Sequence, residues 1–370
     1  MLNSGILERK IDTSPKMMNY KNILVNALVN LGDVVLTTSA LDLIKKNFPD
    51  TSITMLVKAA VKDAVIDNPV VDDVIIFDYA AKENSFKKMR QMMSEIRRRK
   101  FDLSISFDRK LRPALLTFMA GVPVRVGPSK VFDDDTSRVT ILYTDLIKIT
   151  HDLNNTLQAE TYQEIVRQFF NIEGHGLPQF PRKFSPQANV LLKTLAPYKL
   201  KIALCVKGTF ELKTWDKEYF AEVVDKLSEI YDAEFFIVGA PNDKDYANEV
   251  IALTNCDIKN FCGETTLTDL AEIFRKTDLF ITVDTGAAHI AATTGVKMVT
   301  IFGCTPINRW RPINPNSISL SSNAPCCPCK VRPEDCPTYP DPQCLHNVKP
   351  DEVIDAAVKL IRNEHLKVES

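Results

Sequence analysis

Short apolar runs and longer segments with apolar residues at helical spacing alternate along most of the chain. The first series of runs is NILVNAL, SITMLV, VDDVIIFD and DLSISFD, and the second is KIALCV, EFFIVG, IKNFCG, DLFITVD and MVTIFG. Strands that are joined by crossover helices form parallel sheets with helices on both faces. The pattern therefore predicts an α/β protein made of two doubly wound halves of similar size.

A stretch without hydrophobic periodicity separates the first series of apolar runs from the second. Residues 173–186, EGHGLPQFPRKFSP, are rich in Pro and Gly, which is typical of linkers. A chain of 370 residues also exceeds what one core usually fills. We expect a flexible N-terminus over 1–20, an N-terminal domain over 21–172, a C-terminal domain over 187–349, and a closing helix with its tail over 350–370. Ligands of such sheets bind outside the carboxyl ends of the strands, which predicts a cleft between the domains.

The balance of charges argues against a partner that is recognised by charge alone. The chain has 46 basic and 47 acidic residues and a net charge of -1, so no nucleic-acid partner is expected. Its first 21 residues carry charges where a secretory signal needs an apolar core, and no run of about 18 apolar residues occurs. We therefore expect a soluble, cytoplasmic protein.

The stretch VNLGDVVLTTSAL directly follows the first strand-like run. Gly32 permits a tight turn there, and Asp33 then stands at the start of a helix that points into the expected cleft. A carboxylate in that place can take a proton from a substrate hydroxyl, as general-base chemistry requires. The alternative is an ordinary helix N-cap, since Asp is among the preferred capping residues.

Two further motifs follow strands of the second half. In VKGTFELKTWDKEYF, Lys207 and Lys213 flank a Gly- and Thr-containing loop that can present N–H groups and an ammonium to a phosphate. A pair of surface lysines is the alternative. In VDTGAAHIAATTG, Asp284 ends a strand, and the small residues after it stand at a helix N-terminus that attracts anions. His289 on that helix either meets the same ligand or is a core histidine that is satisfied by backbone.

Several catalytic classes lack their sequence signals. No G-x-G-x-x-G follows the first strand, and no G-x-x-x-x-G-K-[ST] occurs, which argues against a dinucleotide oxidoreductase and a P-loop NTPase. No Ser or Cys nucleophile pattern supports a hydrolase triad. The C-terminal half of the sequence thus fits a domain that binds a nucleotide diphosphate without either of these glycine-rich motifs.

Five stretches in this order resemble the glycosyltransferase family 9 enzymes, the ADP-heptose:lipopolysaccharide heptosyltransferases. They are LGDVVLTTSALDLIKKNFPDTSI, FDLSISFDRKLRPALLTFMAGVPVRVG, KGTFELKTWDKEYFAEVVDKL, GETTLTDLAEIF and VDTGAAHIAATTGVKMVTIFG. The resemblance extends from about Asn22 to Ile361. It implies a GT-B fold, in which two Rossmann-like domains face each other across a cleft, with the acceptor on the N-terminal domain and the nucleotide sugar on the C-terminal domain.

The resemblance also implies a reaction, in which heptose is transferred from ADP-heptose to a lipid A and core oligosaccharide acceptor. The transfer inverts the anomeric configuration and needs no metal. The resemblance implies in addition that the protein contacts the inner membrane peripherally, at its cytoplasmic face. Asp33 becomes the base. The implied donor residues are Thr209, Lys213, Asn242, Asp243, Asp284, Thr285, Gly286 and His289. The implied acceptor residues are the basic Arg109, Lys110 and Arg112, for which a solvated helix start is the alternative. Val29 and Asn30 replace the small hydroxyl residues that family members commonly carry before LGD.

A Pro-rich segment near the C-terminus holds five of the nine cysteines. It runs from 326 to 344 and contains Cys326, Cys327, Cys329, Cys336 and Cys344. Reduced or redox-labile thiols suit a cytoplasmic protein. A structural zinc ion on Cys326, Cys329, Cys336 and Cys344 is the alternative, although intervals of six and seven residues are not a standard zinc pairing.

Two other functional classes are compatible with the sequence. One is another GT-B-like nucleotide-sugar enzyme, such as an epimerase, which would change its donor in the absence of any acceptor. The other is a non-catalytic sugar-nucleotide-binding protein, in which Asp33 would have no chemical role. A transferase needs a base at Asp33, so substitution of that residue discriminates between the classes.

Overall fold

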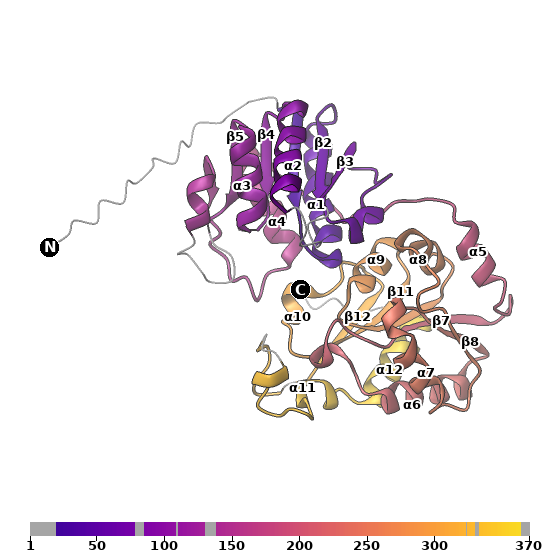
Figure 1. Cartoon of the computed structure of the whole chain (residues 1–370). Helices are drawn as coiled ribbons and strands as arrows, with labels where there is room; N and C mark the ends of the chain where they lie inside the picture. Colours follow the sequence, from indigo (N-terminus) through magenta and orange to yellow (C-terminus); the bar gives the residue numbers. More distant parts are fainter. Residues whose placement is uncertain are drawn as a thin grey trace.

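The structure is a computed structural model of the chain, and it describes residues 20–77, 85–108, 110–129, 138–322, 324–329 and 333–363. Two six-stranded parallel sheets, each with helices on its faces, form the two halves of the molecule (Figure 1). The predicted pair of Rossmann-like α/β domains is confirmed. The expected flexible segment 1–20 lies almost wholly outside the described residues.

The N-terminal sheet has the strand order β3-β2-β1-β4-β5-β6. Its strands are β1 Asn22–Ala27, β2 Ser52–Val57, β3 Asp73–Ile76, β4 Leu103–Ser106, β5 Val124–Pro128 and β6 Asp145–Ile147. The helical segments are α1 Leu31–Asn47, η1 Ala59–Ala64, α2 Ser85–Arg99, α3 Leu111–Ala120, η2 Arg138–Leu142 and α4 Gln158–Phe170. The order reverses between β1 and β4, so the end of β1 is the switch point where ligands of such sheets bind.

The C-terminal sheet has the corresponding order β12-β11-β10-β7-β8-β9. Its strands are β7 Leu200–Cys205, β8 Ala233–Ile237, β9 Ile258–Asn260, β10 Leu279–Val283, β11 Lys297–Phe302 and β12 Ser317–Ser321. Its α-helices are α5 Pro186–Leu192, α6 Lys217–Ile230, α7 Lys244–Ile251, α8 Leu267–Phe274, α9 Gly286–Thr294, α10 Ile307–Trp310, α11 Gln343–His346 and α12 Pro350–Ile361. Its short 3-10 helices are η3 Glu211–Lys213, η4 Pro241–Asp243 and η5 Pro333–Asp335. Here the switch point lies between β7 and β10.

Apolar packing connects the two halves as well as filling each of them. One buried cluster contains β1 and α1 residues together with Ala288 and Ile290 of α9, and a second cluster fills the opposite face of the C-terminal sheet. Helix α9 stops at Gly295, whose positive φ of 78° suits a residue without a Cβ. Within the described residues, no helix is both long enough and apolar enough to cross a lipid bilayer.

Candidate active site

The N-termini of α1 and α9 meet across the domain boundary. A Cβ on Gly32 would lie 2.8 Å from Cδ2 of His289, and a Cβ on Gly286 would lie 2.9 Å from Cδ2 of Leu31. Neither contact leaves room for a side chain, so both glycines are needed for the close approach. Gly32 is the second residue of α1, so it lies inside the helix and not in a tight turn that precedes the helix. The prediction of a tight turn at Gly32 is therefore wrong.

Asp33 lies in the first turn of α1, and Asn30 is the N-cap. The N-cap alternative for Asp33 is therefore wrong. The Tyr162 hydroxyl on α4 instead donates to Oδ1 of Asp33 at 2.9 Å. Burial raises the pKa of the Asp33 carboxyl, and the hydrogen bond from Tyr162 partly offsets that rise. Burial also raises the pKa of Tyr162, so its hydroxyl keeps the proton that it donates.

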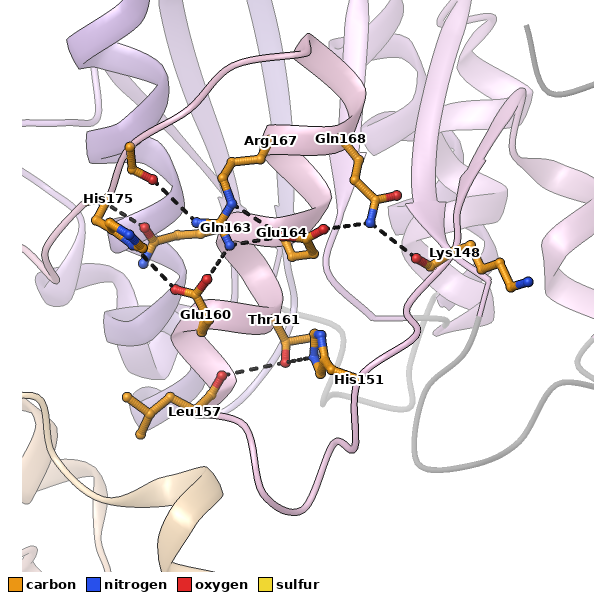
Figure 2. A network of polar contacts seen from close by, with 12 residues as sticks. Lys148, His151, Leu157, Glu160, Thr161, Gln163, Glu164, Arg167, Gln168 and His175 are labelled. Carbon is orange, nitrogen blue, oxygen red and sulfur yellow. Dashed lines mark hydrogen bonds and ion pairs between the residues drawn. The ribbon is translucent and has the colours of Figure 1, made fainter. Parts of the chain in front are cut away.

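Polar contacts fix helix α4 to the chain on either side of it. Figure 2 shows this network, in which Gln163 Oε1 accepts the backbone N–H of Gly176 at 2.7 Å. Before the helix, Nε2 of His151 lies 2.9 Å from the Thr161 hydroxyl. With both flanks held, α4 presents Tyr162 to α1 in a defined position.

Three charged side chains surround Asp33 at longer range. Nζ of Lys110 donates to the carbonyl of Leu28 at 3.2 Å and lies 3.5 Å from a carboxylate oxygen of Asp108. Burial raises the pKa of Asp108, and Lys110 counteracts this. The third is Arg309 of α10, whose positive charge lowers the pKa of Asp33 from the side of the C-terminal domain.

The three predicted acceptor residues differ in their position relative to Asp33 and in whether the structure describes them. Lys110 lies beside the carboxyl end of β1 and therefore close to Asp33. Arg112 is exposed in the first turn of α3. Arg109 lies outside the described residues. Acceptor binding by all three stays a prediction.

A buried ion pair lies at the end of β10. Nζ of Lys213 is 2.6 Å from Oδ2 of Asp284, and the Thr305 hydroxyl donates to the same oxygen at 2.7 Å. Asp284 is only 7% exposed. The ammonium therefore stands directly at the N-terminus of α9. The alternative of two surface lysines does not fit Lys213, because its side chain is largely buried.

The loop that carries Lys213 depends on Gly208. A Cβ on Gly208 would lie 2.3 Å from the carbonyl oxygen of Lys213, and its N–H donates to the Thr214 hydroxyl at 3.1 Å. The loop therefore folds back on itself through a position where only glycine fits. Thr209 is exposed beside it.

Two of the implied donor residues, Asn242 and Asp243, contact their own loop. The carbonyl of Asn242 accepts a hydrogen bond from Nζ of Lys207 at 3.2 Å. Oδ2 of Asp243 accepts the backbone N–H of Ala240 at 2.8 Å. The other carboxylate oxygen of Asp243 lies 3.9 Å from Lys207. Lys207 and Asp243 thus brace the end of β8, while the exposed Asn242 side chain is at the surface of the same loop.

Thr285 is the N-cap residue of α9, yet its side chain makes no capping hydrogen bond. Apart from a contact with the Cys205 thiol, its buried hydroxyl has no hydrogen-bond partner among the described residues. Buried polar groups are nearly always hydrogen-bonded, so a weak thiol contact leaves this hydroxyl poorly satisfied at the start of α9. The free N–H groups of the first turn and the helix dipole favour an anionic ligand.

His289 is a buried, neutral base. Burial lowers its pKa to about 4, with Asp284 opposing the shift and Lys213 adding to it. Its Nδ1 has no hydrogen-bond partner in the described part of the chain, so the alternative of a histidine satisfied by backbone is not supported. A neutral imidazole between Gly32 and the Lys213–Asp284 pair packs the two domains together.

His289 predicts a pH-dependent stability. Its folded pKa of about 4 lies below the ordinary value of 6.5, so the unfolded chain takes up the proton first as the pH falls. The free energy of unfolding should therefore fall between about pH 6.5 and 4, by on the order of 3 kcal/mol from this group. His289→Asn should flatten that slope in urea unfolding measured across the range. His175→Asn, at an exposed site, is the control and should leave the slope as in the wild type.

Sequence reasoning missed four side chains that complete the site. Thr305 follows β11, and its place just beyond a strand end could have indicated it. Tyr162 and Gln158 are ordinary members of a helical pattern, and Arg309 lies in a four-residue helix. No local signal marks these three, because their contacts join residues more than a hundred positions apart.

The cysteine segment packs against the second core cluster beside the site. All nine cysteines are unpaired, and burial raises the pKa of Cys304 to about 12. A hydrogen bond between the Cys327 and Cys344 thiols lowers the pKa of Cys344. No group of three or more His, Cys, Asp or Glu side chains in the described ranges could hold a metal ion. The zinc alternative stays a prediction.

Comparisons with known proteins agree with this fold. The model of glycosyltransferase family 9 (heptosyltransferase) matches residues 89–339. Lipooligosaccharide heptosyltransferase 2 from Campylobacter jejuni is 27% identical over 343 residues, which cover 91% of this chain and 97% of that protein.

Two solved structures share the fold over nearly the whole chain. The family 9 glycosyl transferase from Veillonella parvula has a TM-score of 0.83 at 21% identity and covers 95% of this chain and 100% of its own. The ADP-heptose lps heptosyltransferase II of E. coli has a TM-score of 0.75 at 18% identity and covers 93% and 100%. The arrangement is the GT-B fold. Since the family match spans more than half of the chain, the protein is a glycosyltransferase and belongs to glycosyltransferase family 9, the heptosyltransferases.

Proposed function

We propose that this protein transfers heptose, with inversion, from ADP-heptose to a lipopolysaccharide-core acceptor. Family membership supports glycosyl transfer. The names of the relatives support the finer statement: one is a lipooligosaccharide heptosyltransferase, and one solved neighbour is an ADP-heptose lps heptosyltransferase. The proposed reaction needs no cofactor, and a structural zinc ion at the cysteine segment stays an alternative. The proposed place is the cytoplasmic face of the inner membrane, where the acceptor would be reached.

The observation that carries the proposal is the meeting of two helix N-termini. Asp33 stands on α1, which touches α9 through Gly32 and His289, while Lys213 and Asp284 stand at the start of α9. A base and an anion site from different domains are therefore neighbours. That is the arrangement that attack by an acceptor hydroxyl on a nucleotide sugar requires.

In the proposed mechanism, Asp33 takes the proton of the acceptor hydroxyl as that oxygen attacks the anomeric carbon. Attack comes from the face opposite the diphosphate and so inverts the anomeric configuration. The N–H groups of Thr285 and Gly286, together with the Lys213 ammonium, stabilise the charge that develops on the departing diphosphate. Asp284 and His289 hold this site in shape, and Thr209, Asn242 and Asp243 complete the donor site.

Acceptor recognition is proposed for the basic side chains on the N-terminal domain. Lys110 lies near Asp33, and Arg109 and Arg112 flank it in the sequence. Their positive charges suit the anionic groups of a lipid A and core oligosaccharide. Lys110 would also keep the nearby Asp33 in its charged form, because its charge lowers the pKa of that carboxyl.

A transfer assay tests the proposal. The protein is incubated with a panel of nucleotide sugars and truncated lipopolysaccharide acceptors, and products are read by mass and by the anomeric configuration of the new bond. We expect a heptose-sized mass increase from ADP-heptose only, with inversion. Transfer from a different sugar alone would overturn the substrate assignment, and a changed donor without acceptor would favour an epimerase.

A further inference from the structure

One face of helix α4 contacts both domains. Gln158 and Tyr162 are four residues apart and therefore lie on the same side of the helix. The Tyr162 hydroxyl donates to Asp33 at 2.9 Å, and Nε of Arg309 donates to Oε1 of Gln158 at 2.7 Å. The first contact stays inside the N-terminal domain, whereas the second joins it to the C-terminal domain.

The three side chains in these two contacts with α4 are deeply buried. The exposed fractions are 5% for Gln158, 4% for Tyr162 and 2% for Arg309. Arg309 is thus among the most buried charged residues that the structure describes. Removing an arginine from water is costly unless polar groups receive it. A buried arginine that crosses from one domain to the other is thus a specific feature of the docked arrangement.

We propose that α4 positions the base and couples it to the donor domain: the Tyr162 hydroxyl orients the Asp33 carboxylate, and Gln158 on the same face of α4 holds Arg309 of the C-terminal domain. This inference rests on the proposed role of Asp33. Tyr162, Gln158 and Arg309 are positioning residues here, because they act through Asp33. Docking of the donor domain then delivers both the sugar nucleotide and the cation that favours the ionised base.

The charges around Asp33 give the sign of the effect. The groups that act on it from the neighbouring elements are Asp108, Lys110, Tyr162 and Arg309. Lys58 lies beside Asn30 and acts on Asp108, and His289 contacts Gly32, the residue before Asp33. Burial raises the pKa of Asp33, and Tyr162, Lys110 and Arg309 each lower it, while Asp108 raises it. His289 is neutral over most of the accessible pH range because its pKa is about 4. Removing Tyr162 or Arg309 should therefore raise the pKa of Asp33 further.

Tyr162→Phe tests the orienting contact and keeps the ring that packs against Phe107 at 5.1 Å. With ADP-heptose and a truncated lipopolysaccharide acceptor, we expect kcat to fall about tenfold or more. The acidic limb of the kcat/KM profile should move to higher pH by about one unit, while the KM for ADP-heptose stays unchanged. Tyr246→Phe is the matched control, because its hydroxyl makes a similar 2.9 Å hydrogen bond to the Trp215 carbonyl, far from Asp33.

Arg309→Met and Arg309→Lys test the contribution of the donor domain. The methionine variant should also shift the acidic limb to higher pH, and the lysine variant should restore most of the shift because it keeps the charge. Arg311→Met, at an exposed arginine two residues away, should leave the profile unchanged. Thermal unfolding and ADP binding by calorimetry establish that each variant is folded with an intact donor site.

The inference and the proposed function fail in different ways. An acidic limb in Tyr162→Phe and Arg309→Met that coincides with the wild-type limb would overturn the inference. Asp33→Asn in the same assay would still report on the base. If Asp33→Asn retained full transfer, the base role of Asp33 and the inference that rests on it would be wrong, whereas the proposed function itself would be wrong if the wild-type protein transferred no heptose.

Discussion

Asp33→Asn should lower the rate of sugar transfer by about 10²–10⁴-fold, the usual contribution of a general base. The amide cannot accept the proton of the acceptor hydroxyl at the moment of attack. ADP binding should be unchanged, because the proposed diphosphate contacts are at Lys213 and the N-terminus of α9. Steady-state transfer kinetics together with calorimetric ADP binding measure both quantities.

The substitution is nearly isosteric, which makes the result interpretable. Asparagine keeps an oxygen that can accept the Tyr162 hydroxyl, so the packing between α1 and α4 should persist. Asp50→Asn, in the exposed turn after α1, is the matched control and should transfer at the wild-type rate. A variant at Asp33 with more than about a tenth of wild-type activity would contradict the general-base role. Such a result would assign the proton transfer to a group other than Asp33.

The fold was predictable because its information is local. Each strand-like run is followed by a helical segment, and runs such as LFITV of β10 are buried over their whole length. Continuous apolar runs of that length are typical of strands that are covered on both faces. The alternation therefore indicated two parallel sheets, and the segments that follow the strand ends indicated Asp33, Lys213 and Asp284 as candidate site residues.

The contacts within the site were not predictable in the same way. Gly32 suggested a turn, but its requirement comes from His289, which lies in the other domain. Asp33 suggested a helix cap, but Asn30 has that position and Asp33 is bound by Tyr162. Such pairs depend on how two helices pack after the sheets have formed. The hydrophobic periodicity of a single sequence does not show which helices pack against each other.

Lys213→Met should lower the rate of transfer by about 10²–10³-fold, since it removes the cation nearest the proposed diphosphate site. ADP should also bind more weakly. The variant leaves the carboxylate of Asp284 buried, and among the described residues the Thr305 hydroxyl is then its one side-chain donor. Breaking one side of a buried ion pair typically costs about 3–5 kcal/mol, so the free energy of unfolding should fall as well. Chemical unfolding and transfer kinetics on the same preparation separate the two effects.

A double variant then distinguishes a chemical role of Lys213 from a structural one. Lys213→Met with Asp284→Asn removes both charges, so much of the lost stability should return while transfer and ADP affinity stay low. Lys217→Met is the matched control: this lysine forms a similar pair with Glu249, at 2.8 Å, but on the exposed surface of the same domain. Solvent screens exposed pairs, which contribute little to folding, so stability and transfer should both stay close to wild type. If the double variant regained transfer together with stability, the ion pair would serve only to hold β10 and η3 together, and the diphosphate would have to be bound by the N-terminus of α9 alone.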